Sequence, residues 1–173
     1  MKILETERMT LREVTTGDAK FILDLLNQPS FIRYIGDRNV RTLEQARDYI
    51  ESRFMESYKK FGFGMWAVDL KEMHAPVGIC GFVKRESLPD ADIGFAFLPQ
   101  YEKKGYAYES AVAVMEYGKS VLGLKTILAI TSLDNESSGK LLEKINFKFE
   151  RLIKLPPENE ELKLFSSSAN LFF

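Results

Sequence analysis

The chain has 173 residues, of which 45% are hydrophobic and 28% charged, so it is long enough for one domain and too apolar for a disordered chain. The 24 Lys and Arg residues balance 25 Asp and Glu residues to a net charge of -1, which excludes the strongly basic surface typical of proteins that bind nucleic acid or anionic membranes. One Cys and one His cannot form an intramolecular disulfide or a Cys/His zinc site, so we expect a cytoplasmic protein with one domain, residues 1–173, and no bound metal.

The first half of the chain alternates between strand and helix patterns. Alternating apolar residues predict a strand over Met9–Val14, and an amphipathic helix follows that ends near Pro29. Thr42 and Gln45 form a capping box, in which a hydroxyl and an amide three residues apart bind the free N–H groups of a helix start. This box predicts a longer helix that runs to about Lys60.

The second half changes to short apolar runs separated by turns, which is typical of strands. Two helices interrupt them, one from about Ala107 to a stop at Gly123 and a shorter one over Asn135–Ile145. The longest stretch without a charged residue, Met73 to Val83, is too short for the roughly 20 apolar residues of a membrane span. The element order predicts an α+β fold with a mixed sheet. Its strands in this half are Gly64–Leu70, Pro76–Lys84, Asp92–Leu98, Thr126–Thr131, Phe147–Lys154 and Glu161–Phe165.

A basic turn joins the Asp92–Leu98 strand to the next helix. The N–H groups at a helix start are unpaired and the helix dipole adds positive potential, so this turn can bind a pyrophosphate if Gly105 and Ala107 leave room. Lys103 and Lys104 add positive charge. An ordinary connection with solvated lysines is an equally good interpretation. The spacing matches neither the Walker motif nor the dinucleotide fingerprint, which argues against a P-loop NTPase and a Rossmann enzyme.

A second polar segment follows the Thr126–Thr131 strand directly. Asn135 and Ser138 lie three residues apart at the predicted start of a helix. Either residue caps the helix, which is the commoner role, or presents its amide or hydroxyl to a ligand between this strand and the Asp92 strand.

Together, the two segments resemble the GNAT superfamily of acetyl-CoA-dependent N-acetyltransferases, in particular its RimJ/RimL-like branch. This resemblance implies a mostly antiparallel central sheet with flanking helices, splayed between the fourth and fifth strands. It also implies an enzyme that transfers the acetyl group of acetyl-CoA to a primary amine. Besides the basic turn, the resemblance rests on Leu4–Arg12, Gly62–Val68, Pro76–Gly81 and Asn135–Phe147.

The resemblance also implies where acetyl-CoA binds. The pantetheine arm would lie along the Asp92–Leu98 strand, where the main chain of Phe97 and Leu98 would pair with its amides and a bulge would open the slot. Asn135 and Ser138 would contact the cofactor near the thioester. The pyrophosphate would rest on the main-chain N–H groups of Lys103, Lys104, Gly105, Tyr106 and Ala107.

Several positions depart from the family pattern. Glu102 stands where Arg or Gln is usual, Asn146 replaces a Gly, and Leu142 replaces the tyrosine that many members use to protonate the departing thiolate. Cofactor binding rests mainly on backbone groups and should survive these changes, whereas the proton donor is unassigned. Ser138 is the candidate hydroxyl donor to the thiolate. Asp92, which resembles the position of a glutamate base in some GNAT enzymes, is the candidate base, or else a solvated aspartate at a strand start.

The acceptor amine stays open at this point. RimJ/RimL-like enzymes often acetylate protein N-termini, related chains modify small amines and antibiotics, and a non-catalytic acyl-CoA-binding module is a further alternative. Residues 31–48 and the turn near Pro156 should form the acceptor mouth. There, Arg33, Tyr34 and Arg38 read a carboxylate or a peptide backbone, or are solvated helix residues.

The chain ends in two aromatic residues, Phe172 and Phe173, which are costly to expose to water. They would pack on the sheet or on a second subunit, so a homodimer is a further expectation.

Overall fold

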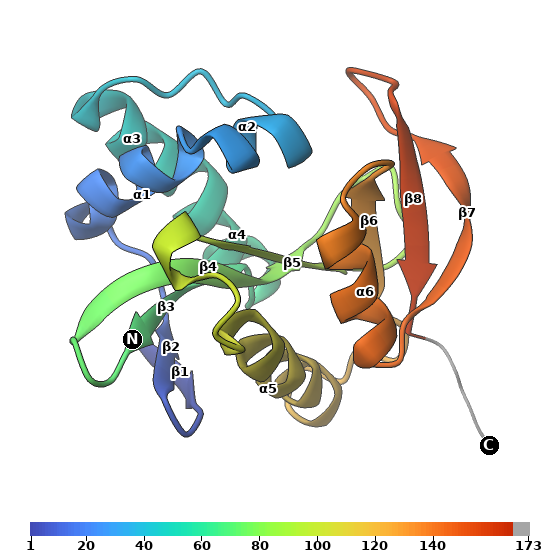
Figure 1. Cartoon of the computed structure of the whole chain (residues 1–173). Coiled ribbons are helices and arrows are strands. Elements are labelled where there is room, and N and C mark those ends of the chain that lie inside the picture. Colours follow the sequence, from blue (N-terminus) through green and yellow to red (C-terminus); the bar gives the residue numbers. More distant parts are fainter. Residues whose placement is uncertain (168–173) are drawn as a thin grey trace.

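The computed structural model describes residues 1–167, which form one curved sheet with helices on both faces (Figure 1). The sheet has eight strands in the order β1-β2-β3-β4-β5-β6-β8-β7. Neighbouring strands run antiparallel except β5 and β6, which are parallel. The predicted α+β fold and its mixed, mostly antiparallel sheet are confirmed. The strands are β1 Lys2–Glu5, β2 Met9–Arg12, β3 Met65–Leu70, β4 Ala75–Val83, β5 Asp92–Phe97, β6 Leu128–Ser132, β7 Lys148–Lys154 and β8 Glu161–Ser166.

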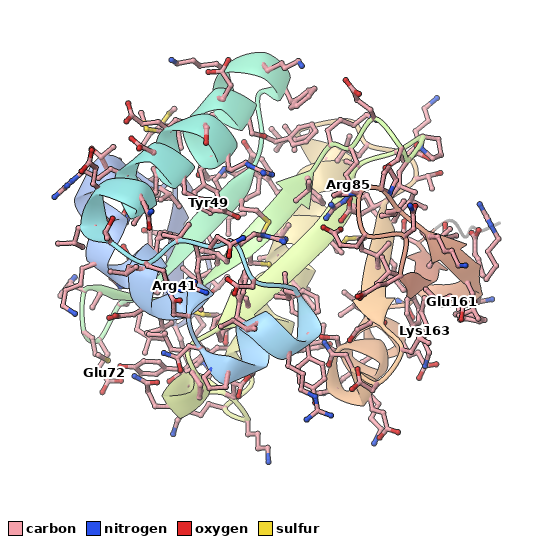
Figure 2. All side chains as sticks on the ribbon, turned by 90° about the horizontal axis from the view of Figure 1, so that it is seen from above. Arg41, Tyr49, Glu72, Arg85, Glu161 and Lys163 are labelled. Atoms are coloured by element: carbon pink, nitrogen blue, oxygen red, sulfur yellow. The ribbon has the colours of Figure 1, made fainter. Side chains whose placement is uncertain are left out.

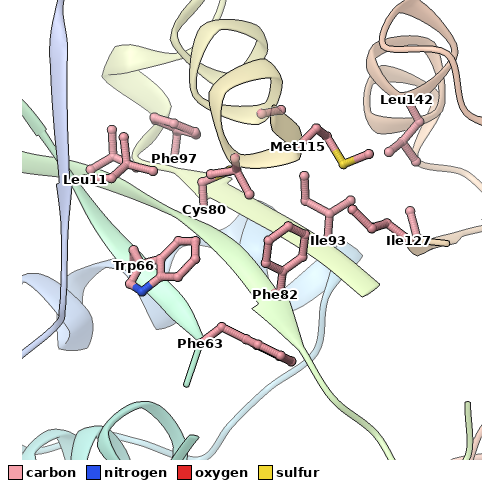
Figure 3. Packing of buried hydrophobic residues seen from close by; sticks show 14 of the residues in the cluster. Leu11, Phe63, Trp66, Cys80, Phe82, Ile93, Phe97, Met115, Ile127 and Leu142 are labelled. Atoms are coloured by element: carbon pink, nitrogen blue, oxygen red, sulfur yellow. The ribbon is translucent and has the colours of Figure 1, made fainter. Parts of the chain in front are cut away.

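The helices form two layers because successive strand residues point to opposite faces of the sheet. Ala67 of β3 packs with the helices between β2 and β3, whereas its neighbour Trp66 packs with α5 and α6 on the other face. Figure 3 shows this second cluster, in which Trp66 and Phe82 lie beneath α5 and Leu142 reaches in from α6. The helices are α1 Ala19–Leu26, α2 Pro29–Tyr34, α3 Leu43–Tyr49, α4 Glu56–Phe61, α5 Tyr106–Ser120 and α6 Glu136–Lys144, with short helical turns η1 Thr16–Asp18, η2 Ile50–Met55 and η3 Pro99–Tyr101.

The long helix predicted after Thr42 is present as α3, η2 and α4, which follow one another without a break. The helix cap is confirmed, since the Thr42 hydroxyl accepts the Gln45 N–H at 3.1 Å. In an ideal capping box the Gln45 side chain would accept the N–H of the cap residue, Thr42. Here it accepts the N–H of Arg41, one residue before the cap, at 2.7 Å. The middle of the run, η2, is π-helical.

The sheet opens between β5 and β6. These two strands share one residue pair, Asp92 with Leu128, and then separate. The bulge expected in β5 is wrong: its ladder with β4 is unbroken from Asp92 opposite Val83 to Phe97 opposite Gly78. The opening therefore follows from the twist of the sheet and from the core side chains that meet below it. Ile93, Ile127 and Leu142 belong to that cluster.

Two other expectations concern the C-terminal aromatic residues and membrane-spanning helices. The predicted packing of Phe172 and Phe173 lies outside the described residues. Within residues 1–167, none of the helices has the length and apolar character that crossing a membrane requires.

Candidate active site

A cavity of about 450 Å³ lies beside the C-terminal half of β5. Its walls come from segments far apart in the sequence: α2, β5, the turn before α5, and the first turns of α5 and α6. Packing of the two helical layers against a splayed sheet brings these segments together. The lining includes Phe31 and Tyr34 from α2, Phe95 to Phe97 from β5, and Leu141 from α6.

The main chain of Leu98 is not available to this cavity. Its N–H donates to the Val77 carbonyl at 2.9 Å, and its carbonyl accepts the Tyr101 N–H at 2.9 Å. Both groups are used within the fold, so the prediction that Leu98 pairs with pantetheine is wrong. The physical reason is the phase of the antiparallel ladder, which turns Leu98 toward β4.

Phe97 and Phe95 have the opposite phase. Residues of an antiparallel strand direct their N–H and carbonyl groups alternately to the two edges. Because Leu98 points to β4, Phe95 and Phe97 direct theirs toward the gap left by β6. Ala91 confirms the phase, since its carbonyl accepts the Leu128 N–H at 2.9 Å. The gap therefore exposes a strand edge that can pair with an extended ligand containing amides.

The basic turn reaches the same cavity. Lys103 and Gly105 have positive φ angles of 62° and 83°, and Gly105 is the residue before the first turn of α5. Lys103, Gly105 and Ala107 line the cavity. Lys104 and Tyr106 are not among its lining residues in the described chain. Lys104 is exposed, and Tyr106 packs against the core beneath the guanidinium of Arg8.

Arg8 holds this turn from behind, a contact that the sequence reasoning missed. Its Nη1 donates to the Lys104 carbonyl at 3.0 Å, and its guanidinium lies 4.5 Å from the ring centre of Tyr106. Its Nε donates to Glu109 at 2.7 Å. Burial by itself would raise the pKa of the Glu109 carboxyl, but hydrogen bonds from Thr6 and Arg8 lower it below its usual value. A surface arginine in a strand turn carries no local signal for this role.

The start of α6 forms the opposite wall. Asn135 caps the helix, since its Oδ1 accepts the Ser138 N–H at 3.2 Å, and both residues also line the cavity. The cap, the commoner of the two roles expected for Asn135, is confirmed, and its contact with a ligand stays a prediction. Among the described residues, the Ser138 hydroxyl has no hydrogen-bond partner, so it is free to bind a ligand. Leu142 is buried in the core and offers no proton donor.

Asp92 is not brought to the cavity. Its side chain is 2% exposed, and Arg85 donates to it from Nε at 2.9 Å. Figure 2 shows Arg85 at the opposite end of β5 from α2. The alternative of a solvated aspartate is wrong because the residue is buried, and the role of a base stays a prediction that this placement does not support. Burial raises the pKa of the Asp92 carboxyl above its usual value, although the charge of Arg85 opposes that shift.

The residues expected at the acceptor mouth differ in where they lie. Tyr34 lines the cavity, whereas Arg33 pairs with Asp134 at 3.1 Å across the two halves of the molecule. Arg33 also lies 4.9 Å from the ring centre of Tyr34. Its guanidinium is thus engaged by this chain's own carboxylate. Arg38 and Pro156 are not among the cavity residues of the described chain.

Known proteins resemble this chain along most of its length. Residues 8–148 match the family model described as an acetyltransferase (GNAT) domain. The chain is 33% identical to YoaA of Bacillus subtilis (strain 168), an uncharacterized N-acetyltransferase, with 88% of this chain and 86% of that protein covered. A GNAT-family acetyltransferase from Bacillus anthracis is 28% identical, with a TM-score of 0.76 and 96% of each chain covered. RimL, an alpha-N-protein acetyltransferase for ribosomal L7/L12 solved with coenzyme A, has a TM-score of 0.82 over 96% of this chain and 97% of its own. At 15% identity, it shows the fold alone.

Proposed function

The chain belongs to the GNAT family of acetyltransferases, and from that premise we propose that it acetylates the α-amino group at the N-terminus of a polypeptide. Membership of this family establishes that the chain is an acetyl-CoA-dependent N-acetyltransferase. The proposal adds the identity of the acceptor amine. The observation that carries it is a cavity with a free strand edge and a neutral, hydroxyl-rich wall, in which Glu102 is the one carboxylate among the described lining residues.

The residues around the cavity fit acetyl-CoA. The main-chain edge at Phe95 and Phe97 suits the two amides of a pantetheine arm, and the N–H groups around Gly105 and Ala107 suit its pyrophosphate. Lys103 adds positive charge at the same turn. When bound, acetyl-CoA supplies a thioester carbonyl that a neutral amine can attack. Among residues 1–167, no three His, Cys, Asp or Glu side chains gather as a metal site would need.

The absence of a placed base favours an α-amine. A chain N-terminus has a pKa of about 7.7 to 8.0, so a sizeable fraction is already neutral near pH 7.5. A lysine amine with a pKa near ~10.4 is neutral to only about one part in a thousand at that pH. The described cavity residues include one carboxylate, Glu102, which lies on the phosphate-binding turn. An acceptor that needs little help in losing a proton suits such a site.

The charge of the cavity also favours a peptide N-terminus as the acceptor. Polyamines and aminoglycosides carry several positive charges, and a site that selects them needs carboxylates to pair with them. Here, Glu102 is balanced by Lys103, and the other polar lining is neutral: Ser30, Tyr34, Tyr101, Tyr108, Asn135, Ser137 and Ser138. Hydroxyl and amide groups suit the neutral backbone of a peptide.

The test is release of free CoA thiol from acetyl-CoA with a panel of acceptors. We expect unblocked peptides to be acetylated with kcat/KM at least about tenfold above spermidine or an aminoglycoside, with the new acetyl group on the α-nitrogen by mass spectrometry. The same peptides with a formylated N-terminus are the matched control and should be inactive. Thiol release confined to the polycations would overturn the proposed acceptor, as would acetylation of peptide lysines alone.

Asp92→Asn tests the base predicted from the sequence. Because the carboxylate is buried and paired outside the cavity, we expect kcat to stay within about tenfold of the parent. Burial raises the folded-state pKa above the unfolded value near 3.8, so the parent loses stability as pH rises through this window. The uncharged asparagine avoids that loss, so its melting temperature relative to the parent should rise across the same window. Thermal melts and steady-state rates measure both effects.

Asp90→Asn makes the same chemical change two residues earlier, outside the ion pair with Arg85. It should change neither kcat nor the pH dependence of the melting temperature. A fall in kcat of roughly 10²- to 10⁴-fold for Asp92→Asn, with unchanged stability, would instead support Asp92 as the base.

A further inference from the structure

Arg8 joins the turn between β1 and β2 to the turn before α5. Its Nη1 donates to the main-chain carbonyl of Lys104 at 3.0 Å, and its Nε donates to Oε1 of Glu109 at 2.7 Å. The other carboxylate oxygen of Glu109 accepts the main-chain N–H of Arg8 at 3.0 Å and the hydroxyl of Thr6 at 2.6 Å. The guanidinium also lies 4.5 Å from the ring centre of Tyr106. These contacts hold the guanidinium in one place, although the side chain is partly exposed.

The contact with Lys104 sets the orientation of one peptide unit. The Lys104 carbonyl and the Gly105 N–H belong to the same trans peptide, in which these two groups point in opposite directions. Because the carbonyl is directed at Arg8, the Gly105 N–H is directed away from Arg8. That N–H donates no hydrogen bond to any described residue. Gly105 lines the cavity, whereas Arg8 is not among the described lining residues.

A glycine turn does not keep this orientation by itself. Gly105 has a φ of 83°, and glycine adopts positive and negative φ about equally well. The peptide unit before it can therefore rotate and exchange the directions of its carbonyl and its N–H. In the rotated state, the Lys104 carbonyl would replace the N–H and repel an anion. A guanidinium bound to that carbonyl opposes the rotation, because the rotation would break a charge-assisted hydrogen bond.

We propose that Arg8 is a positioning residue for acetyl-CoA: by holding the Lys104 carbonyl, it keeps the Gly105 N–H directed at the pyrophosphate. This inference rests on the acetyl-CoA site described above and is independent of the acceptor amine. The same contact polarises the peptide unit and makes its N–H a stronger donor, because hydrogen bonds in a chain strengthen one another. Glu109 orients Arg8, since its carboxylate binds Nε while Nη1 binds the turn.

Positive charge by itself explains the arrangement less well. The carboxylate of Glu109 lies 2.7 Å from Nε of Arg8, so the pair adds little net charge beside the cavity. Burial opposes the ionisation of Glu109, but hydrogen bonds from Thr6 and Arg8 lower the pKa of its carboxyl below the usual value, so it is charged at neutral pH. The role of Arg8 therefore depends on the planar arrangement of its donors, which the single ammonium of a lysine cannot reproduce.

The first test is Arg8→Lys, which keeps the charge and removes the planar set of donors. Titration calorimetry should show CoA and dephospho-CoA, which both contain the pyrophosphate, binding about tenfold more weakly, because a hydrogen bond to a charged group is lost. Pantetheine, which has no phosphate, should show in an NMR titration an affinity within about twofold of the parent's. Arg53→Lys is the matched control, since that guanidinium also lies against a tyrosine ring, 5.8 Å from the centre of Tyr49, and is not at the cavity. It should change none of these affinities.

The amide signal of Gly105 reports the orientation of the peptide directly. In protein labelled with ¹⁵N-glycine, CoA should move this proton signal downfield in the parent, as expected for an N–H that binds an anion. Arg8→Lys should lose most of that movement, and the signal is assigned by its absence from the spectrum of Gly105→Ala.

Glu109→Gln separates orientation from charge. Removing a negative charge near an anion site should tighten CoA binding if charge decides, whereas loosening the partner of Nε should weaken it about threefold if orientation decides. Equal or tighter binding by Glu109→Gln would overturn the role of Arg8. So would an Arg8→Lys affinity for CoA within twofold of the parent, an equal loss for CoA and pantetheine, or an unchanged response of the Gly105 signal. If the parent bound no CoA, the acetyl-CoA site itself would be wrong, and this inference with it.

Discussion

Gly105→Val should weaken CoA binding about 100-fold, the largest loss of affinity that we expect from one substitution. Gly105 has a φ of 83°, immediately precedes the first turn of α5 and lines the cavity. A branched side chain is strained at this φ and would shift the turn. A Cβ here would also stand 3.2 Å from Nη2 of Arg8, the residue that holds the turn from behind. Titration calorimetry with CoA measures the loss.

The variant Gly123→Val is a matched control that separates backbone strain from the loss of CoA binding. Gly123 also has a positive φ, 69°, with nothing near a Cβ at that position, and it follows the far end of α5. Gly123→Val should therefore lower thermal stability by a similar amount and leave CoA affinity unchanged. The double variant Lys103→Ala/Lys104→Ala should lose less than about tenfold. A larger loss from the two lysines than from Gly105→Val would mean that side-chain charge, rather than the backbone, holds the pyrophosphate.

Ser138→Ala should lower kcat about 100-fold while acetyl-CoA affinity stays within about twofold. Its hydroxyl lines the cavity and is free among the described residues, whereas its N–H is bound by Asn135. Alanine keeps that N–H, so the helix cap survives and the change removes only the hydroxyl. A positioned proton donor contributes roughly 10²- to 10⁴-fold to a rate, so its loss should appear in kcat rather than in binding. Rates with a confirmed acceptor and calorimetry with acetyl-CoA check the two halves of the prediction.

Ser137→Ala is the neighbouring control, because Ser137 also lines the cavity one residue earlier on α6. It should leave kcat within about twofold of the parent. A Ser138→Ala rate within fivefold of the parent would contradict the role of Ser138.

Local patterns were sufficient for much of the fold. The hairpin of β3 and β4, the strand β5 and the caps at Thr42 and Asn135 were predicted from alternation and from cap residues within a few positions of one another. These features depend on contacts that are close in sequence. The strand β1 and the short helix α2 were missed, because elements of 4 and 6 residues are too short to show a clear periodicity.

The candidate site divides in the same way. The turn that contains Lys103, Gly105 and Ala107 was recognised from the sequence because a strand, a turn and a helix start follow one another in consecutive residues, and these three residues line the cavity. The tertiary structure alone decided which edge of β5 stays open, since the pairing of Leu98 with Val77 depends on the register between strands.

Long-range contacts also determined how single side chains are paired and buried. Arg85 pairs with the buried Asp92, and Arg8 reaches the turn before α5 across about a hundred residues of sequence. The sequence by itself thus determined the family, the order of elements and the backbone that suits a pyrophosphate. Which polar groups are paired, buried or free was set only by tertiary packing, because hydrogen bonds and burial depend on residues that the chain brings together from far apart.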